Sequence, residues 1–185
     1  MVLEEKEDQS DLNPILDSIR FLTKRPSPLK GFLRGFNHFS HAFKLTNNIN
    51  YQIRTVSVTN SIYKTSDAYF EFRNNWAEGK INSEKGYKAL ALNDSNKFIC
   101  EISFESKRKI SKDDARKILE LLEKHNAAKV FLGFNKPLEK KFLPSETEMR
   151  LARQFKSIGE KLKVSVIDQL ILNDCESYSF EDNGL

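Results

Sequence analysis

The chain has 185 residues, of which 39% are hydrophobic and 30% charged, and its formal net charge is +4. That length allows one domain with a core and an extension, and it argues against two full-sized domains. The composition is typical of a soluble protein, and no apolar run approaches the roughly 20 residues that span a bilayer. Two isolated cysteines, Cys100 and Cys175, are too few for a disulfide framework or a CxxC metal site, so we expect both to be buried thiols.

Residues 1–12 are polar and charged, and we expect them to be disordered because they cannot offset the entropy of ordering. They lack the basic-then-apolar layout of a secretory signal, which makes a cytoplasmic protein the default expectation. Charge is unevenly placed beyond them, because the chain has no acidic residue between Ser18 and Ser66. This asymmetry predicts that the N-terminal part meets an acidic partner or packs on the acidic remainder of the chain.

Residues 13–45 have helical periodicity in two pieces, separated by Pro26-Ser27-Pro28. Phenylalanines recur along this stretch, and its basic residues form a possible binding segment that consists of Arg20, Lys24, Arg25, Lys30, Arg34 and Lys44. Such a basic aromatic segment suits nucleic acid, a membrane surface or the groove of a partner. Phenylalanines at helical spacing more often pack against the protein's own domain or a second subunit.

From Tyr51 onward the pattern predicts a folded domain. A strand that begins at Tyr51 is followed by a helix that is capped at Ser66 and continues to Trp76. Two further strands, over residues 87–92 and 98–105, are joined by the polar run Asn93-Asp94-Ser95-Asn96, which predicts a hairpin.

The second half of the domain alternates helices and strands. Ser111, with Asp114 three residues later, caps a helix with an apolar stripe, and residues 130–132 form a short buried strand. Another helix begins after Ser145 and leads to a strand over 164–172, and a short hairpin closes the chain. Hairpins mixed with helical crossovers predict an α/β (α+β) domain in which helices flank a mixed sheet. We place an extension at residues 1–50 and the domain at 51–185.

The last part of the chain resembles a known family. It reads Val164-Ser165-Val166-Ile167-Asp168-Gln169-Leu170-Ile171-Leu172-Asn173-Asp174, followed by Tyr178-Ser179-Phe180 and Gly184-Leu185. This phrase is similar to the end of RadC-type JAB/MPN domains, the fold of the JAMM zinc hydrolases. Upstream, Asn126-Ala127-Ala128 and Asn135 with Pro137 resemble the family's NAA turn and the loop with its two histidines. The resemblance implies a bacterial protein with a JAB1/MPN, cytidine-deaminase-like layered fold.

In active members of that family a glutamate on a strand acts as general base, while His-x-His and a downstream aspartate hold zinc. Carried over by position, the resemblance implies Glu101 as the base. Phe134 and Lys136 stand at the two histidine positions and Glu148 at the aspartate position, and the family's serine is kept as Ser145. Phenylalanine offers no lone pair and lysine offers a cation, so we expect no zinc site of the usual kind and no other cofactor.

The same residues suggest a replacement for the metal. If the fold is kept, Lys136 would bridge Glu101 and Glu148 as an ion pair, and Phe134 would fill the vacated space. The simpler interpretation is that Ser145 and Glu148 form a helix capping box, that Lys136 points to solvent and that Glu101 is an ordinary strand residue.

Three functions follow from this sequence. The first is a binding or scaffold module that has lost hydrolysis, in a family labelled as DNA repair, with a protein partner or a homo-oligomer. The second is a JAMM-type metal-dependent peptidase or isopeptidase that holds zinc through atypical ligands, although His38, His41 and His125 are not placed to supply them. The third is binding of nucleic acid or a partner through residues 18–44. Salt-sensitive binding that disappears when residues 1–50 are deleted would support this function.

Overall fold

The computed structural model describes residues 43–54, 61–76, 86–106, 108–136 and 142–185. All of them lie in one compact unit, Asn37–Leu185. A separate unit, Met1–Phe36, lies outside the described residues, and so do the predicted disordered stretch 1–12 and most of the predicted helical segment 13–45.

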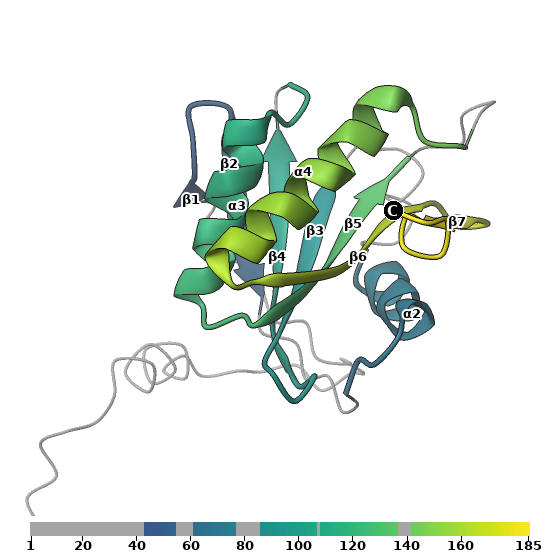
Figure 1. Cartoon of the computed structure of the whole chain (residues 1–185), viewed down its shortest axis with the longest axis horizontal. Helices are drawn as coiled ribbons and strands as arrows, with labels where there is room; N and C mark the ends of the chain where they lie inside the picture. The colour runs from purple at the N-terminus through teal and green to yellow at the C-terminus, as the bar shows by residue number, and fades with distance from the viewer. Residues whose placement is uncertain (1–42, 55–60, 77–85, 107, 137–141) are drawn as a thin grey trace, which may run out of the picture. The chain divides into compact units, whose positions relative to one another are not determined.

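Within the described ranges, seven strands form one mixed sheet in the order β1-β2-β4-β3-β5-β6-β7 (Figure 1). Their bounds are β1 Phe43–Lys44, β2 Ile49–Arg54, β3 Tyr87–Leu92, β4 Phe98–Ser106, β5 Lys129–Asn135, β6 Ser165–Leu172 and β7 Ser177–Ser179. Only β5 and β6 pair in parallel, because a helix crosses over between them, and the other neighbours are antiparallel. The predicted hairpin of residues 87–105 is confirmed as β3 and β4.

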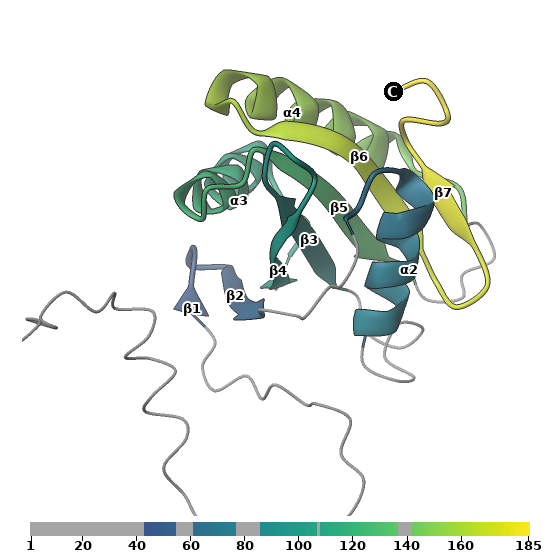
Figure 2. The ribbon, with the colours of Figure 1, turned by 90° about the horizontal axis from the view of Figure 1, so that it is seen from below.

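The helices cover both faces of the sheet. They are α2 Thr65–Asn75, α3 Lys112–Lys124 and α4 Glu146–Leu162. Figure 2 shows α3 and α4 on one face and α2 on the other. Each face has its own apolar core, one that includes Leu119 of α3 and Phe155 of α4, and one that includes Phe72 of α2. This arrangement confirms the predicted α/β fold with a mixed sheet, and every helix in the described ranges is too short or too polar to cross a bilayer.

Glycine allows α2 to approach the centre of the sheet. A β-carbon built on Gly133 of β5 would lie 2.9 Å from the ring of Phe72, which is closer than real side chains come. The absence of a side chain on Gly133 therefore lets the Phe72 ring lie directly on β5. A larger residue at position 133 would therefore clash with Phe72.

Local signals in the sequence place the helix starts well, with one exception. The predicted capping boxes of Ser111 with Asp114 and of Ser145 with Glu148 are both present. Helix α2 begins at Thr65 with Lys64 as N-cap, so the predicted cap at Ser66 is wrong by two residues. The reason is Asp67, whose carboxylate accepts hydrogen bonds from the backbone N–H groups of Tyr63 and Lys64 and so closes the first turn earlier.

Two further expectations differ from the structure. Phe43 and Lys44, predicted as the end of a helical segment, form strand β1, in which the ring of Phe43 lies 5.4 Å from that of Tyr51. Cys100 is buried as predicted, but Cys175 is exposed. Strand β6 ends at Leu172, and the Asn173 side chain accepts hydrogen bonds from the backbone of the next turn, which places Cys175 at the tip of the last hairpin.

The Asp114 cap of α3 gives a prediction for acid stability. Burial alone would raise the pKa of Asp114, but hydrogen bonds from Ser111 and the Arg108 guanidinium, 2.8 Å away, lower it below its ordinary value of 3.8. Because the pKa is lowered in the folded state, the ionised Asp114 carboxylate stabilises the fold fully above pH 3.8. That stabilisation is lost as the pH falls through the pKa of Asp114 in the folded protein. Asp114→Asn should therefore cost about 1 kcal/mol at neutral pH. In urea unfolding followed by circular dichroism, the difference in free energy of unfolding between the variant and the wild type should decrease below pH 3.8.

Candidate functional site

The end of strand β5 carries the two positions that the resemblance assigns to zinc-binding histidines. Side chains alternate between the faces of a strand, so Phe134 points to the α3/α4 face together with Leu132, and Asn135 points to the α2 face together with Gly133. Asn135 is fully buried, and its side-chain oxygen accepts a hydrogen bond from the backbone N–H of Gly86. The end of β5 is thereby tied to the start of β3.

Phe134 is packed into the core. Its ring stacks on Tyr87 of β3, with centroids 4.7 Å apart and an angle of 21° between the planes, and only 8% of the residue is exposed. Ala152, Ile171 and Phe180 complete a small apolar cluster around it. Phe134 is therefore a core residue in this structure. That its ring fills the space of a metal stays a prediction.

Tyr87 belongs to the same site, although it was not among the predicted residues. Burial raises the pKa of Tyr87 to about 12, and the negative charge of Glu148 adds to the shift. The phenol is therefore neutral at physiological pH, and it places an uncharged hydroxyl group beside the replaced ligand positions. The register that sets Tyr87 opposite Phe134 arises because β3 inserts between β4 and β5.

Lys136 is buried beside Glu148, and it does not point to solvent as the simpler interpretation expected. Its Nζ lies 3.5 Å from a Glu148 carboxylate oxygen and donates a hydrogen bond of 3.2 Å to the backbone carbonyl of Leu143. The same carboxylate oxygen accepts hydrogen bonds from the backbone N–H and the hydroxyl of Ser145. Glu148 therefore forms the capping box with Ser145 and also an ion pair with Lys136. The sequence had suggested these two roles as alternatives.

Glu101 lies elsewhere. It is completely buried in β4, and its carboxylate is 2.6 Å from Nζ of Lys88 in β3. Lys88 also donates to the backbone carbonyl of Asn75 and lies over the ring of Trp76, with Nζ 5.2 Å from the ring centroid. Burial lowers the pKa of Lys88, and Glu101 opposes that shift. These contacts form an ion pair on the α2 face of the sheet.

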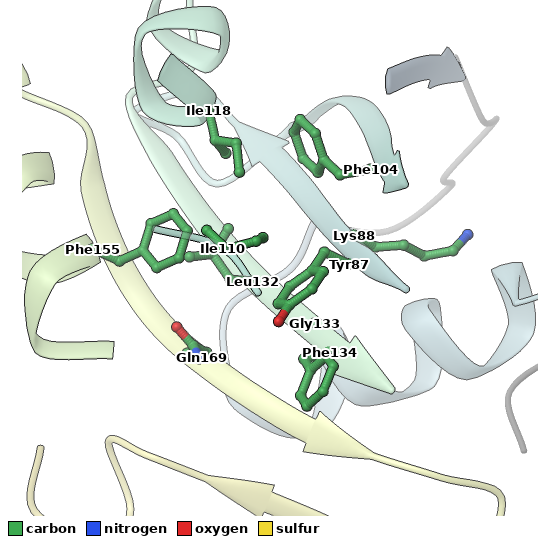
Figure 3. Close-up of a pocket in the computed structure, with 10 residues that line it drawn as sticks. All are labelled: Tyr87, Lys88, Phe104, Ile110, Ile118, Leu132, Gly133, Phe134, Phe155 and Gln169. Carbon is green, nitrogen blue, oxygen red and sulfur yellow. The ribbon is translucent and has the colours of Figure 1, made fainter. Parts of the chain in front are cut away.

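The sheet therefore separates Glu101 from the other predicted site residues. Glu101 is paired in register with Leu90 and Lys88 with Gly133, and Gly133 points away from the face that carries Phe134. Figure 3 shows Lys88 pointing away from the stacked rings of Tyr87 and Phe134. The predicted bridge from Glu101 through Lys136 to Glu148 thus differs from the structure: Glu148 pairs with Lys136, and Glu101 has its own cation in Lys88, on the opposite face. Strand alternation is the physical reason.

Little space remains beside the stacked rings. A cavity that is lined by Tyr87, Phe134, Phe155 and Gln169, among others, has a volume of about 10 Å³ (Figure 3). A cavity needs about 10–15 Å³ to hold one water molecule, so this one is too small for a substrate. Gln169 faces the cavity from β6, and its buried side-chain oxygen has no hydrogen-bond partner among the described residues. A single water molecule is the largest guest that this space suits.

The residues at the implied zinc position do not fit zinc. Phe134 has no donor atom, and the ammonium of Lys136 repels a cation and occupies the carboxylate of Glu148. Within the described ranges, no three His, Cys, Asp or Glu side chains gather closely enough to hold a metal ion. His125 is the C-cap of α3, whereas His38 and His41 lie outside the described residues.

The phrases that resemble the family serve to hold the fold. Asp168 of β6 is buried and accepts hydrogen bonds from the Thr65 hydroxyl, from the Ser179 hydroxyl and from the backbone N–H of Glu181. It thereby joins the start of α2 and the last hairpin to the sheet. Together with the capping box of Ser145, these contacts keep the framework of the site in place while its ligand positions differ.

The possible binding segment is barely represented in the structure. Lys44 is exposed in β1, whereas Arg20, Lys24, Arg25, Lys30 and Arg34 lie outside the described residues. The prediction that this segment binds nucleic acid or a partner therefore stays a prediction. The residues that sequence reasoning missed are Tyr87 and Lys88, and a lysine within the apolar run of β3 was a signal for a buried ion pair.

Comparison with known proteins agrees with this framework. The family model described as RadC-like JAB domain matches residues 62–185, which is more than half of the chain. A UPF0758 protein of Flavobacterium johnsoniae is 32% identical over 114 residues, a match that covers 58% of this chain and 46% of that relative. The match thus spans about half of the relative's length. The chain belongs to the RadC-like JAB domain family.

Proposed function

We propose that this chain is a binding module built on a RadC-like JAB domain, and that it does not hydrolyse substrates through zinc. The observation that carries this proposal is the contact of Phe134 with Tyr87 at a position where the resemblance implies an imidazole. A stacked ring fills the site, and the neighbouring cation, Lys136, already holds the carboxylate that would serve as a ligand. Neither group can activate a water molecule as a zinc ion does.

The placement of Glu101 adds support. A general base must lie within hydrogen-bond reach of the water that it deprotonates. Glu101 is fully buried on the α2 face, and its carboxylate is bound to Lys88. Among the described residues, the groups beside the replaced positions are the neutral phenol of Tyr87 and the carboxylate of Glu148, which is paired with Lys136. These groups are better suited to stabilising the fold than to transferring a proton. A cytoplasmic location and a role in DNA repair remain expectations from the sequence and the resemblance.

Metal analysis of the full chain tests the proposal. After incubation with excess zinc and removal of free metal, mass spectrometry should find far less than one zinc per chain. The matched variant Phe134→His/Lys136→His, which restores both imidazoles beside Glu148, should retain more zinc than the wild type. Circular dichroism would verify that the variant is folded. One zinc per wild-type chain, removed by a chelator together with a peptidase activity, would instead establish the metal-dependent hydrolase.

A further inference from the structure

A wide groove lies beside the first turns of α4. Its volume is about 740 Å³, and its lining includes Leu143, Pro144, Met149, Arg150, Arg153 and Tyr178. Leu143 and Pro144 precede the helix, and Tyr178 comes from β7, so three separate segments form the walls. The groove is far larger than the filled space beside Phe134, and it has room for several side chains of a partner.

Two arginines in this groove have no ion-pair partner among the residues that the structure describes. Arg150 and Arg153 are three residues apart on α4, so they lie on one side of the helix, and both are exposed. No described acidic side chain lies within ion-pair distance of either guanidinium. Lys156, one turn further on, differs because it is paired with Glu181 at 2.6 Å and donates to the carbonyl of Leu185. The positive charge of the two arginines is therefore available to an anionic partner.

The groove also has an apolar part, although Glu146 and Thr147 add polar groups to its lining. Leu143 is 69% exposed and is one of the four large hydrophobic residues that the described surface leaves open to solvent. Pro144, Met149 and the ring of Tyr178 lie beside it in the lining. An apolar wall next to the exposed guanidinium groups of Arg150 and Arg153 suits a ligand that carries both apolar and acidic groups.

The replaced metal site supports one wall of this groove. Lys136 holds the carbonyl of Leu143 at 3.2 Å and the carboxylate of Glu148 at 3.5 Å, and Glu148 caps the helix at Ser145. The segment that presents Leu143 is thus anchored at the start of α4. A wall that is already anchored costs less entropy on binding than a mobile one.

We propose that this groove binds a short acidic segment of a partner protein. An apolar side chain of that segment lies on Leu143 and Tyr178, and its carboxylates pair with Arg150 and Arg153, whose planar guanidinium groups match carboxylates in a bidentate manner. This inference rests on the proposed binding role and names the partner's chemistry. Glu146 also lines the groove, so the acidic groups of the segment must lie on the side of the two arginines. Nucleic acid fits less well, because two cations are few for a phosphate backbone.

Peptide selection tests the groove directly. A phage library of random dodecapeptides would be panned on the immobilised full chain, and enriched peptides would be synthesised with a fluorophore for anisotropy titration. Enriched sequences should contain at least two acidic residues and a large apolar one. Arg150→Glu/Arg153→Glu should weaken their binding at least about tenfold, because it replaces two attractive charges by repulsive ones.

The control is Arg116→Glu/Lys117→Glu, which makes the same change of charge on the exposed face of α3. This variant should change affinity less than about twofold, because screening by salt removes most of the effect of distant charges. Equal weakening by both variants, enrichment of peptides without acidic residues, or no enrichment would overturn the inference. The inference would also be overturned if a single-stranded 20-mer DNA outcompeted the peptides and its binding were lost in Arg150→Glu/Arg153→Glu. The zinc measurement is independent, so the groove and the proposed loss of hydrolysis can fail separately.

Discussion

Lys88→Met should lower the free energy of unfolding by about 3–5 kcal/mol, which is the usual cost of removing one partner of a buried ion pair. Glu101 is completely buried and lies 2.6 Å from Lys88, whose side chain is itself only 10% exposed. Without the ammonium, the completely buried carboxylate would lose the cation that offsets its removal from water. Urea unfolding at neutral pH, followed by tryptophan fluorescence and circular dichroism, measures the difference.

Two control variants make this result specific. Lys97→Met removes an exposed lysine from the loop before β4 and should change stability by less than about 0.5 kcal/mol. Lys88→Met/Glu101→Leu removes both charges and should recover most of the loss, because a buried pair and a packed apolar pair are often similar in stability. If the double variant were as unstable as the single one, packing and not the unpaired charge would explain the cost.

Strand register explains why sequence reasoning misplaced Glu101. The resemblance correctly indicated the family, and the strand of Glu101 was correctly predicted. Whether a side chain on β4 shares a face with one on β5 depends on the strand between them and on its register. Tyr87 pairs with Phe134 and with Phe104, so the even-numbered residues of β4 and β5 share a face and Glu101 falls on the other one. This pairing is a tertiary property that no local pattern in the sequence encodes.

Capping motifs were easier to predict from the sequence than the pairing of strands. Capping boxes at Ser111 and Ser145 involve residues only three positions apart, so both were visible in the sequence and both are present. The short strand at Phe43 was not visible, because two residues carry no periodicity and β1 exists only through its pairing with β2. The 10 Å³ cavity and the open groove likewise arise from segments that are distant in the chain.

The second large effect is expected at the stacked rings. Phe134→Ala should cost about 3–5 kcal/mol, because it removes a ring that is buried against Tyr87, Ala152 and Ile171 and leaves a cavity in a core that cannot collapse fully. Phe70→Ala is the matched control, since Phe70 is 57% exposed on α2 and its loss should cost less than about 0.5 kcal/mol. Urea midpoints of the two variants, measured at equal chain concentration, give the comparison.

The size of this loss distinguishes two interpretations of the replaced histidine position. If Phe134 is a structural residue, its ring stabilises the fold, and Phe134→His would place a polar group in an apolar cluster at a cost that bound zinc must offset. If the position were an open site that only lacks its ligand, Phe134→Ala would be nearly neutral. A loss below about 1 kcal/mol would contradict the structural role, because truncating a buried phenylalanine to alanine normally costs far more. A loss in the expected range would mean that zinc bound by Phe134→His/Lys136→His must offset the packing that the ring of Phe134 provides.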